Sequence, residues 1–271
     1  MSLIDRHEDI VRILELRERV TVSELADRLA VSEVTVRKDL ALLEEAGQLV
    51  RTRGGARVAQ DRTLVLPIEA RLSSLPLVKE RIGRAAADLV REGDTVFIDS
   101  GSTCLAVARA IAGMTLRVVT NSLDVANALS RSSGVSIHLT GGSFRRDARS
   151  FIGPVAAETA RRFHYDRAFL GASGVSLDGA FSSQNAIESD VKRAAVEQAH
   201  RAIVVTDATK VGRAAFSIFA RADDVHTVIV DDDRTGSSAL DELERRTRIE
   251  VIRVDPRRRR SRSIRAVATT R

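Results

Sequence analysis

The stretch Asp-Ser-Gly-Ser-Thr at residues 99–103 has the residue types that hold a phosphate. It follows the apolar run TVFI and leads into LAVARAIA, whose apolar residues have helical spacing. Gly101 permits a tight turn, and Ser102 and Thr103 add hydroxyl donors where the free N–H groups and dipole of a helix favour an anion. Asp99 would repel an adjacent phosphate, so we expect it to accept from a sugar hydroxyl or to orient the loop. Taken alone, such a turn also fits an ordinary strand-to-helix connection.

Similar turns follow three other apolar runs, at Thr120-Asn121, Gly141-Gly142 and Gly171. Ligands of parallel sheets collect along the edge where the strands end. Thr120 and Asn121 can exchange hydrogen bonds with hydroxyls, and the glycines permit close approach of the backbone. Ordinary turn chemistry explains each glycine singly, but four turns at one sheet edge predict a binding site.

Charged residues come from two further stretches, SSQNAIESDVKRAAV and DATK. Glu188 and Lys192 are four residues apart and share a helix face, as an ordinary surface pair also would. As site residues they would line the pocket mouth, with Lys192 toward the phosphate. Asp207 and Lys210 follow the apolar run AIVVT and would reach the same edge.

The elements that must position these residues alternate along the chain. Between the predicted strands lie segments with helical spacing, which is typical of a largely parallel α/β sheet. The strands are expected at 95–99, 116–120, 135–140, 167–171, 202–206, 227–230 and 249–254. The helices are expected at 79–91, 103–112, 122–130, 154–163 and 186–200.

The N-terminal residues predict a different module. Helices are expected at 5–18, Val22–Leu29 (capped by Thr21 or Ser23) and Glu33–Ala46, the last with Ser32 as N-cap and Gly47 as C-cap. The following QLVRTRGGARV predicts two short strands around Gly54-Gly55. This layout is typical of a winged helix-turn-helix, whose last helix lies in the major groove of double-stranded DNA.

The third helix can bury Val36, Leu40 and Leu43 on one stripe, which turns the intervening polar residues outward. Arg37 can then form a bidentate pair with guanine, and Thr35 can contact a phosphate or a thymine methyl group. The wing arginines can neutralise phosphates beside the groove. The DNA-binding candidates are Ser32, Thr35, Arg37, Lys38, Arg51, Arg53 and Arg57. A three-helix module for protein interaction is the alternative.

Residues 5–255 resemble the DeoR family of bacterial transcription regulators. The family's recognition helix is matched by Val31-Ser32, Thr35-Val36-Arg37 and Asp39-Leu40, and its glycines by Gly47 and Gly54-Gly55. Its effector-domain motifs are matched by KERI from Lys79, DSGST, VVTNS, LTGGSFR, FLGASGV and DATK. The resemblance implies an α/β domain similar to ribose-phosphate isomerase and coenzyme A transferase folds, with a phosphorylated sugar as effector. Three of only four lysines in the chain, Lys79, Lys192 and Lys210, lie in stretches matching the family's pattern.

Two functions fit these observations. One is a regulator, a repressor of a carbohydrate-utilisation operon, controlled by a sugar phosphate; the other is a phosphosugar isomerase or transferase with a DNA-binding appendage. Isomerase chemistry needs a carboxylate base and a group to polarise a carbonyl, which Asp99, Glu188, Asp207 and Lys210 could nominally supply. No histidine lies in the motifs, and a metabolic enzyme has no use for the N-terminal module. We therefore favour the regulator, without catalytic residues, cofactor or metal, as a dimer or tetramer that binds repeated half-sites.

Composition sets the remaining expectations. The predicted domains are residues 1–58 (DNA-binding), 59–78 (linker), 79–255 (effector-binding) and 256–271 (tail). The tail carries seven arginines and no acid, which exceeds the whole net charge of +6. We expect it to be a disordered extension, and an arm that grips phosphates is the alternative. No run is long and apolar enough for a bilayer, and the first residues lack a signal-peptide core, so a cytoplasmic protein without membrane contact is expected.

Overall fold

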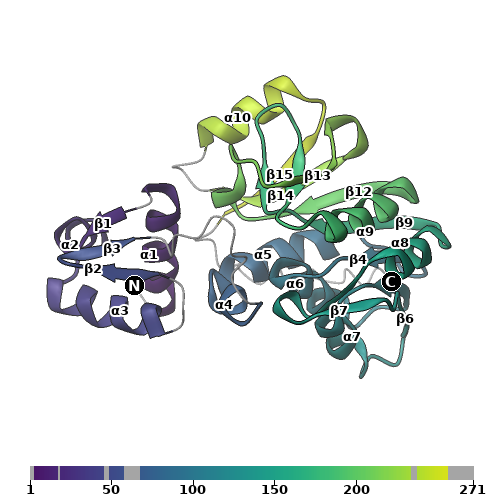
Figure 1. The fold of residues 1–271 in the computed structure, drawn as a ribbon, viewed down its shortest axis with the longest axis horizontal. Helices are drawn as coiled ribbons and strands as arrows, with labels where there is room; N and C mark the ends of the chain where they lie inside the picture. The colour runs from purple at the N-terminus through teal and green to yellow at the C-terminus, as the bar shows by residue number, and fades with distance from the viewer. Residues whose placement is uncertain (1–2, 18, 46–48, 58–67, 233–236, 256–271) are drawn as a thin grey trace, which may run out of the picture.

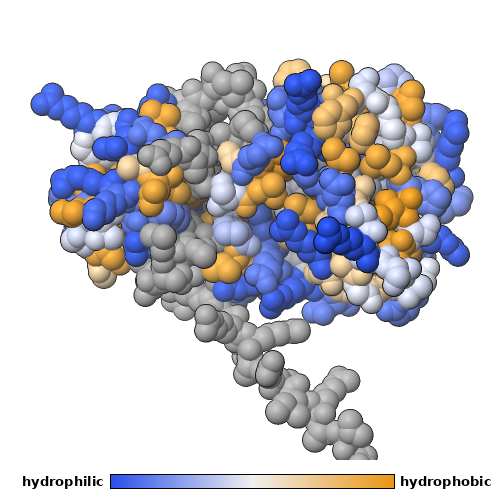
Figure 2. Space-filling model, turned by 90° about the horizontal axis from the view of Figure 1, so that it is seen from below, coloured by the Kyte–Doolittle hydropathy of each residue, from blue (hydrophilic) through white to orange (hydrophobic). Residues whose placement is uncertain are grey.

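The chain folds into a small N-terminal and a larger C-terminal domain (Figure 1). The computed structural model describes residues 3–17, 19–45, 49–57, 68–232 and 237–255. The predicted cap Gly47, the first part of the predicted linker and the Arg-rich tail lie outside these residues. Hydrophilic residues cover much of the visible surface, with smaller hydrophobic areas between them (Figure 2). Among the described helices, none has the length and apolar character to cross a membrane.

Three helices and a small antiparallel sheet make the N-terminal domain. They are α1 (Leu3–Arg17), β1 (Arg19–Thr21), α2 (Val22–Leu29), α3 (Glu33–Glu45), β2 (Val50–Thr52) and β3 (Gly55–Arg57), with strand order β1-β3-β2. Thr21 caps α2, because its hydroxyl accepts from the Glu24 N–H at 3.2 Å and its own N–H donates to the Glu24 carboxylate at 2.9 Å. The three predicted helices and the wing are confirmed; β1 was missed because three residues are too few to show a period.

One apolar core holds the three helices together. Ile10 from α1, Leu25 from α2, and Val36 and Leu40 from α3 are each at most 1% exposed. Leu43 is buried with them, which confirms the predicted stripe on the third helix. Burying several such side chains, at about 1.5–3 kcal/mol each, fixes which face of α3 remains outside.

The C-terminal domain is built on a seven-stranded parallel sheet with the order β15-β14-β12-β9-β4-β5-β6. Its strands are β4 (Thr95–Ile98), β5 (Leu116–Thr120), β6 (Val135–Leu139), β9 (Tyr165–Gly171), β12 (Ala199–Val205), β14 (Thr227–Asp231) and β15 (Glu250–Val254). All seven correspond to predicted strands. The expected fold class, a winged helix-turn-helix followed by a larger α/β domain, is confirmed.

Helices cover both faces of this sheet because alternate residues of each strand point to opposite sides. Val96 and Ile98 pack with α5 (Pro76–Ala87) and α6 (Ser102–Ile111), near α7 (Leu123–Leu129). Phe97 packs instead toward α8 (Pro154–Arg161) and α9 (Ala186–Glu197), on the face that α10 (Ser237–Arg246) extends. Burial on both faces explains why the strands are continuous apolar runs.

Short elements cross the edge of the sheet. β7 (Ser143–Arg145) and β8 (Ser150–Ile152) form a hairpin around the turn η1 (Arg146–Ala148). β10 (Gly174–Val175), β11 (Phe181–Ser183) and β13 (Ser217–Ala220) form an antiparallel sheet. The short helices η2 (Ala208–Lys210) and η3 (Ala222–Asp224) follow β12 and β13. None of these short elements has a readable period, and sequence analysis did not place them.

The order of the strands creates a crevice between β4 and β9. From β4 the chain continues to β5 and β6 on one side, and then returns to β9, β12, β14 and β15 on the other. Connections that leave in opposite directions separate at the carboxyl ends of the two middle strands, where open α/β sheets bind ligands. The turns after β4 and β9, at Asp99 and Gly171, are therefore the two nearest this crevice.

The second half of the predicted linker is helical, which corrects the expectation for residues 68–78. α4 (Ile68–Ser73) and the start of α5 occupy it. α4 is too short to show a helical period, and Pro76 lies at the start of α5, where a proline is tolerated. The two features that favoured a linker are thus compatible with helices packed on the C-terminal domain.

The two domains meet through α1. This helix contacts η2 of the C-terminal domain. Arg12 on α1 donates from Nη2 to Oδ2 of Asp231 at 2.8 Å, and Asp231, at the end of β14, is fully buried. The N-terminal domain is therefore fastened beside the carboxyl edge of the large sheet.

Candidate functional site

Helix α3 presents its polar residues to solvent, as the sequence predicts. Glu33, Arg37 and Lys38 are exposed and Thr35 is half-buried. Ser32 precedes the helix, and its Oγ accepts from the Thr35 N–H at 3.2 Å. The outer face of α3 thus has the donors and acceptors that read base edges in a major groove.

Arg37 is already paired within its own helix. Its Nη2 lies 2.5 Å from the Glu33 carboxylate one turn earlier, and the two side chains are 55% and 46% exposed. The pair is accessible, so a guanine or phosphate can replace Glu33 without unfolding the helix.

A buried carboxylate fixes α3 against α1. Asp39 is 2% exposed and accepts from Nε and Nη2 of Arg6, at 2.5 and 3.0 Å, and lies 3.1 Å from a ring nitrogen of His7. Burial opposes ionisation of Asp39, but the hydrogen bonds from Arg6 and His7 outweigh it and lower its pKa. These contacts join α1 directly to α3.

The wing is shaped by its two glycines. Gly54 has a φ of +86°, and a Cβ on Gly55 would lie 2.1 Å from the Val20 carbonyl oxygen. Arg51 and Arg53 are exposed on this hairpin. Arg57, at the end of β3, is half-buried. The tight packing of β3 on β1 thus fixes the arginine-bearing hairpin in the small sheet.

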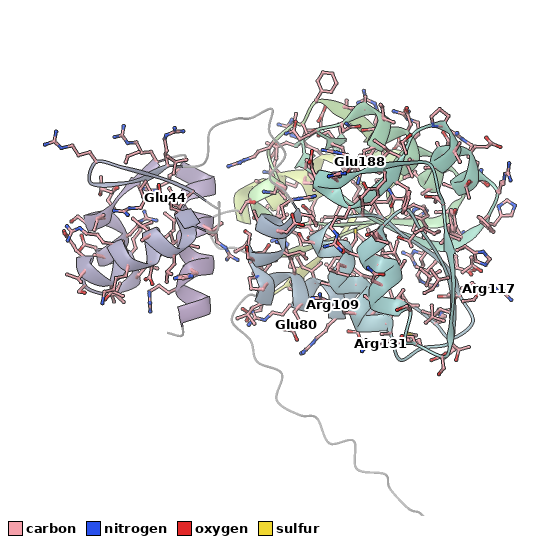
Figure 3. All side chains as sticks on the ribbon, turned by 60° about the horizontal axis from the view of Figure 1, so that its bottom comes forward. Glu44, Glu80, Arg109, Arg117, Arg131 and Glu188 are labelled. Atoms are coloured by element: carbon pink, nitrogen blue, oxygen red, sulfur yellow. The ribbon has the colours of Figure 1, made fainter. Side chains whose placement is uncertain are left out.

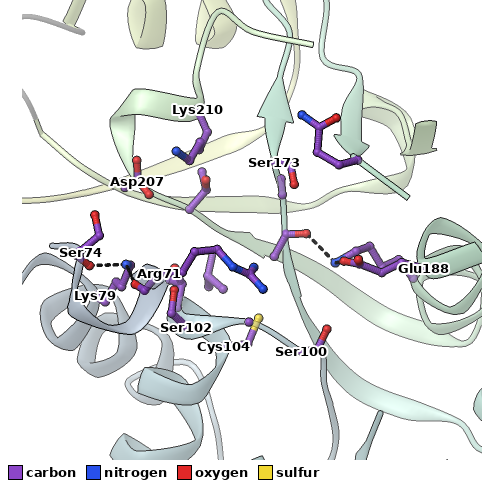
Figure 4. A pocket seen from close by; sticks show the side chains of 18 residues that line it. Arg71, Ser74, Lys79, Ser100, Ser102, Cys104, Ser173, Glu188, Asp207 and Lys210 are labelled. Atoms are coloured by element: carbon purple, nitrogen blue, oxygen red, sulfur yellow. Dashed lines mark hydrogen bonds and ion pairs between the residues drawn. The ribbon is translucent and has the colours of Figure 1, made fainter. Parts of the chain in front are cut away.

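A pocket of about 220 Å³ opens at the crevice between β4 and β9 (Figure 4). It takes residues from the turns after β4, β9 and β12 and from α4, α5 and α9. The lining residues are Arg71, Ser74, Lys79, Ser100, Gly101, Ser102, Thr103, Cys104, Gly171, Ala172, Ser173, Gln184, Glu188, Lys192, Val205, Thr206, Asp207 and Lys210. Nine of these, from Lys79 to Lys210, are predicted ligand-binding residues, and the strand order explains why they meet.

One wall of the pocket is the first turn of α6. Gly101, with a φ of +117°, precedes the helix and has no side chain to accept from the following N–H groups. Ser102 and Thr103 are half-buried beside it. This wall offers backbone and hydroxyl donors under the positive end of a helix dipole, which suits an anion.

A second wall is a buried charge network around Lys192. Its ammonium donates to Asp99, lies 3.2 Å from Oε1 of Glu188 and donates to the Gly171 carbonyl oxygen at 3.0 Å. Burial disfavours the charge on Lys192, but Asp99 and Glu188 outweigh it and raise its pKa. Because an ammonium has three protons, these contacts use all of them.

Glu188 also receives a second cation. Nη1 of Arg145, from the β7–β8 hairpin, donates to its Oε2 at 2.7 Å. Burial raises the pKa of a carboxyl group, but Lys192 and Arg145 outweigh it here and lower the pKa of Glu188. Glu188 is thus a charged carboxylate with partners on both oxygens, at the end of the pocket opposite Lys79 (Figure 4).

The turn after β12 adds one carboxylate and one cation. Asp207 caps η2 by accepting from the Thr209 N–H at 3.2 Å and from the Thr209 hydroxyl. Burial disfavours its charge, but Lys210 and Lys79 outweigh burial and lower the pKa of Asp207. Lys210 stands beside it at the pocket (Figure 4).

Lys79 donates hydrogen bonds to backbone carbonyl oxygens at the pocket. It is 6% exposed, and its Nζ donates to the carbonyl oxygens of Arg71, at 2.5 Å, and Ser74. These bonds hold the end of α4 against the pocket. Lys79 therefore also fixes the position of Arg71.

Arg71 lines the pocket but was not predicted from the sequence, and it adds a guanidinium to the site. Its guanidinium points into the middle of the pocket (Figure 4). Nε and Nη2 are buried and have no hydrogen-bond acceptor among the described residues. Burial lowers the pKa of Arg71. An arginine within IEARLSS was a possible signal, but the surrounding prolines favoured a linker. Ser173 and Gln184 were missed as well.

Five predicted residues do not line this pocket. One is Asp99, which is fully buried and whose Oδ2 accepts from Lys192 and from the Gly171 N–H. Thr120, Asn121, Gly141 and Gly142 follow β5 and β6, which are on the far side of β4 from β9. With strands about 4.8 Å apart, β6 lies three strand spacings from β9. Thr120 instead donates to the Ile98 carbonyl oxygen at 2.6 Å, and Asn121 is fully buried. The shared sheet edge was predicted, but the distance along it was not.

Comparison with known proteins agrees with this geometry. Residues 6–62 match the DeoR-like helix-turn-helix domain, and residues 77–232 match the DeoR C terminal sensor domain. The transcriptional repressor AccR of Agrobacterium fabrum is 35% identical, over 85% of this chain and 90% of its own. The glycerol-3-phosphate regulon repressor of Escherichia coli (strain K12) is 33% identical, over 79% of this chain and 85% of its own.

Among solved structures, ribose 5-phosphate isomerase A of Methanocaldococcus jannaschii covers 50% of this chain and 53% of its own, at 15% identity and a TM-score of 0.37. A winged helix-turn-helix fused to a parallel-sheet sensor domain defines a DNA-binding regulator that responds to a ligand. The chain belongs to the DeoR family of transcription regulators. Its relatives are repressors, which sets aside the isomerase or transferase alternative.

Proposed function

We propose that this protein represses a carbohydrate-utilisation operon under the control of a phosphorylated sugar bound in the pocket. The observation that carries the proposal is the convergence of the α6 N-terminus with Arg71 and Lys210 at the crevice between β4 and β9. A small, polar, cationic pocket suits a phosphate monoester of a sugar better than an apolar ligand. As a regulator of chromosomal genes it acts in the cytoplasm.

In this proposal one region of the pocket binds the phosphate of the ligand and another binds its sugar hydroxyls. The phosphate lies against Ser102, Thr103 and the first N–H groups of α6, with Lys210 balancing its charge. The sugar hydroxyls face the carboxylates. Oδ1 of Asp99 is buried and has no donor among the described residues, so it is the proposed hydroxyl acceptor. Lys192 holds Asp99 and Glu188 in place rather than binding the phosphate.

The N-terminal domain supplies the operator contacts. Ser32, Thr35, Arg37 and Lys38 face the major groove, and the wing arginines face phosphates. A dimer or tetramer places two copies of α3 on repeated half-sites. The effector shifts operator affinity only if it binds the two arrangements of these helices with different affinity.

The operator contacts are tested by selecting DNA from a random pool with the full chain and measuring gel-shift affinity. Arg37→Ala should remove sequence preference while ligand affinity stays unchanged, because a bidentate arginine–guanine pair contributes about 1–3 kcal/mol of discrimination. Arg117→Ala is the control, since Arg117 is exposed on the C-terminal domain, away from Glu188 (Figure 3). Unchanged preference in Arg37→Ala would refute the placement of α3.

The effector is tested by calorimetry with a panel of sugar phosphates and the corresponding free sugars. We expect at least one phosphate ester to bind and to change operator affinity, and we expect Ser102→Ala to weaken that binding. If no ester binds or alters DNA affinity, the sensor is not specific for phosphorylated sugars.

A further inference from the structure

Arg71 has an unusual environment for a guanidinium. Nε and Nη2 form the edge of the guanidinium that binds an anion with two parallel hydrogen bonds. Both atoms are buried, and neither has an acceptor among the described residues. A buried donor without an acceptor costs about 1–3 kcal/mol, so native proteins rarely retain one without a use.

The same edge of Arg6 shows what this geometry binds. Nε and Nη2 of Arg6 hold the two carboxylate oxygens of Asp39 at 2.5 and 3.0 Å. In the described part of the chain, no carboxylate oxygen accepts from this edge of Arg71. Glu188 is the carboxylate with the largest electrostatic effect on Arg71, but Arg145 and Lys192 already occupy its oxygens.

The surroundings of Arg71 also favour an anion. Its Nη1 lies near Gly101, since it would be 3.8 Å from a Cβ built there, and Gly101 precedes the first turn of α6. The Nη1 end of the guanidinium thus lies beside the start of that helix, and Arg71, Ser102 and Thr103 line the same pocket. Lys79 bonds the Arg71 carbonyl oxygen and keeps α4 in this position.

We propose that Arg71 is a direct ligand of the effector's phosphate, gripping two of its oxygens through Nε and Nη2. The inference rests on the proposed function and deepens it, because it selects a dianionic phosphate monoester over a neutral sugar. It also places a ligand contact on α4, the first described element after the wing strand β3. Effector binding thus acts on the segment that leads from the DNA-binding domain.

The test is calorimetry on the full chain with inorganic phosphate, glycerol 3-phosphate, ribose 5-phosphate and glucose 6-phosphate, and with the free sugars. Arg71→Ala should weaken binding of the preferred ester by roughly 10- to 100-fold, the usual contribution of a charge-assisted hydrogen bond. Arg71→Lys should recover only part of this loss, because lysine keeps the charge but lacks the planar edge. Arg117→Lys is the matched control, and circular dichroism checks that each variant is folded.

The outcomes separate this inference from the proposed function. An ester that binds wild type and Arg71→Ala equally overturns the role of Arg71 and leaves the phosphate sensor standing. A wild-type chain that binds a free sugar but none of the esters overturns both. A loss in Arg71→Ala that Arg71→Lys fully restores shows that charge alone acts, and the bidentate grip is then wrong.

A second inference comes independently from the contact between the domains. Asp231 is fully buried and uses both carboxylate oxygens: Oδ1 accepts from the Ala208 N–H at 2.7 Å and Oδ2 accepts from Arg12 at 2.8 Å. Ala208 lies directly between Asp207 and the rest of η2, so this carboxylate joins the pocket turn to α1. Helix α1 in turn holds the recognition helix through Arg6 and Asp39.

We infer that Asp231 relays changes at the pocket turn to the DNA-binding domain through Arg12. A shift of η2 on ligand binding would alter the Ala208 bond and hence the position of the carboxylate that anchors α1. The arrangement links the two sites by three consecutive ion pairs or hydrogen bonds and needs no movement within either core.

The relay is tested by a double-mutant cycle and by hydrogen exchange. Arg12→Gln and Asp231→Asn should be coupled in denaturant unfolding, so that the double variant is destabilised clearly less than the two single effects combined. In the wild-type chain a bound phosphate ester should change exchange in both η2 and α1, and in Arg12→Gln only in η2. Additive variants, or an unchanged α1 response in Arg12→Gln, would overturn the relay.

Discussion

Two buried aspartates, one in each domain, differ in how completely their carboxylate oxygens are hydrogen-bonded. Asp39 in the N-terminal domain has both oxygens occupied by Arg6, with His7 beside them. Asp99 in the C-terminal domain has one oxygen bonded by Lys192 and Gly171, while Oδ1 has no donor among the described residues. Arg71 nearby has unpaired donors as well.

Asp39 has partners for both oxygens within the fold, whereas Asp99 keeps one oxygen free within the described part of the chain, which we propose accepts from a ligand. Both side chains are almost completely buried, yet their pKa shifts are opposite: the bonds from Arg6 and His7 outweigh burial and lower the pKa of Asp39, whereas burial raises the pKa of Asp99. Low exposure alone therefore does not identify a binding site.

The two places differ in their hydrogen bonds. Both oxygens of Asp39 accept from Arg6. By contrast, Oδ1 of Asp99 has no donor, and Nε and Nη2 of Arg71 have no acceptor, among the described residues. Removing a partner from a buried ion pair should therefore destabilise the protein in either domain, whereas removing a buried donor that has no acceptor should not.

The largest effect is expected for Lys192→Met. This variant leaves Asp99 and part of Glu188 buried without their cation, so the free energy of unfolding should fall by about 3–5 kcal/mol. Denaturant unfolding followed by circular dichroism measures it. Arg131→Met, at an exposed arginine of the same domain (Figure 3), is the control and should have no comparable effect. Equal midpoints for the two variants would show that the Lys192 network is not structural.

A smaller and contrasting pair of effects is expected at the two arginines. Arg6→Ala leaves Asp39 without its strongest partner and should cost about 1–3 kcal/mol. Arg71→Ala removes two buried donors, Nε and Nη2, that have no acceptor among the described residues, so the free energy of unfolding should be unchanged or higher. Unfolding of both variants without ligand gives the comparison. A greater loss in Arg71→Ala than in Arg6→Ala would mean that Arg71 has a structural role.

The pH dependence of Asp39 sharpens the contrast further. The folded state lowers the pKa of Asp39, so its contribution to stability is complete above the unfolded pKa of about 3.9 and is lost as pH falls through the folded pKa. Wild type should therefore exceed Asp39→Asn in stability at neutral pH, and the difference should shrink below about pH 4. Hydrogen exchange of α3 amides measures it, and a difference that grows in acid would contradict the assignment.

The smallest effect is expected on the DNA-facing side of α3. The exposed pair of Glu33 and Arg37 should contribute about 0.3–0.5 kcal/mol, as pairs one helical turn apart usually do. Glu33→Ala should accordingly leave thermal unfolding almost unchanged. A loss above about 1 kcal/mol would show that the pair holds the helix and is not free to exchange for DNA.

Much of the fold was readable from the sequence because the strands are buried on both faces. Runs such as TVFI and AIVVT have few other interpretations between helical segments, and the stripe of Val36, Leu40 and Leu43 fixed the outer face of α3. The order of the strands was not readable, since it depends on contacts between distant segments. This is why Thr120 and Gly141 were expected at the same pocket, although they follow β5 and β6, the first and second strands beyond β4.

The ion pairs and hydrogen bonds of the pocket were harder to predict than the identity of its charged residues. Lys192 was found from its type and spacing, but its three acceptors come from three separate elements. Arg71 was hidden in a helix of six residues. The helical spacing predicted the partner of Lys192 on the same helix, Glu188, but the contacts to Asp99 and Gly171 depend on how distant segments fold together.

The only cysteine of the chain, Cys104, lines the pocket and can report its opening through the rate at which it reacts. Its thiol lies fully buried in the first turn of α6, and burial raises its pKa, so a thiol reagent reacts with it only when the turn lifts from the sheet. The rate of alkylation therefore counts openings of the wall proposed to hold the phosphate. A ligand bound to that wall should slow the reaction in proportion to its occupancy, so alkylation of this one side chain would report effector binding.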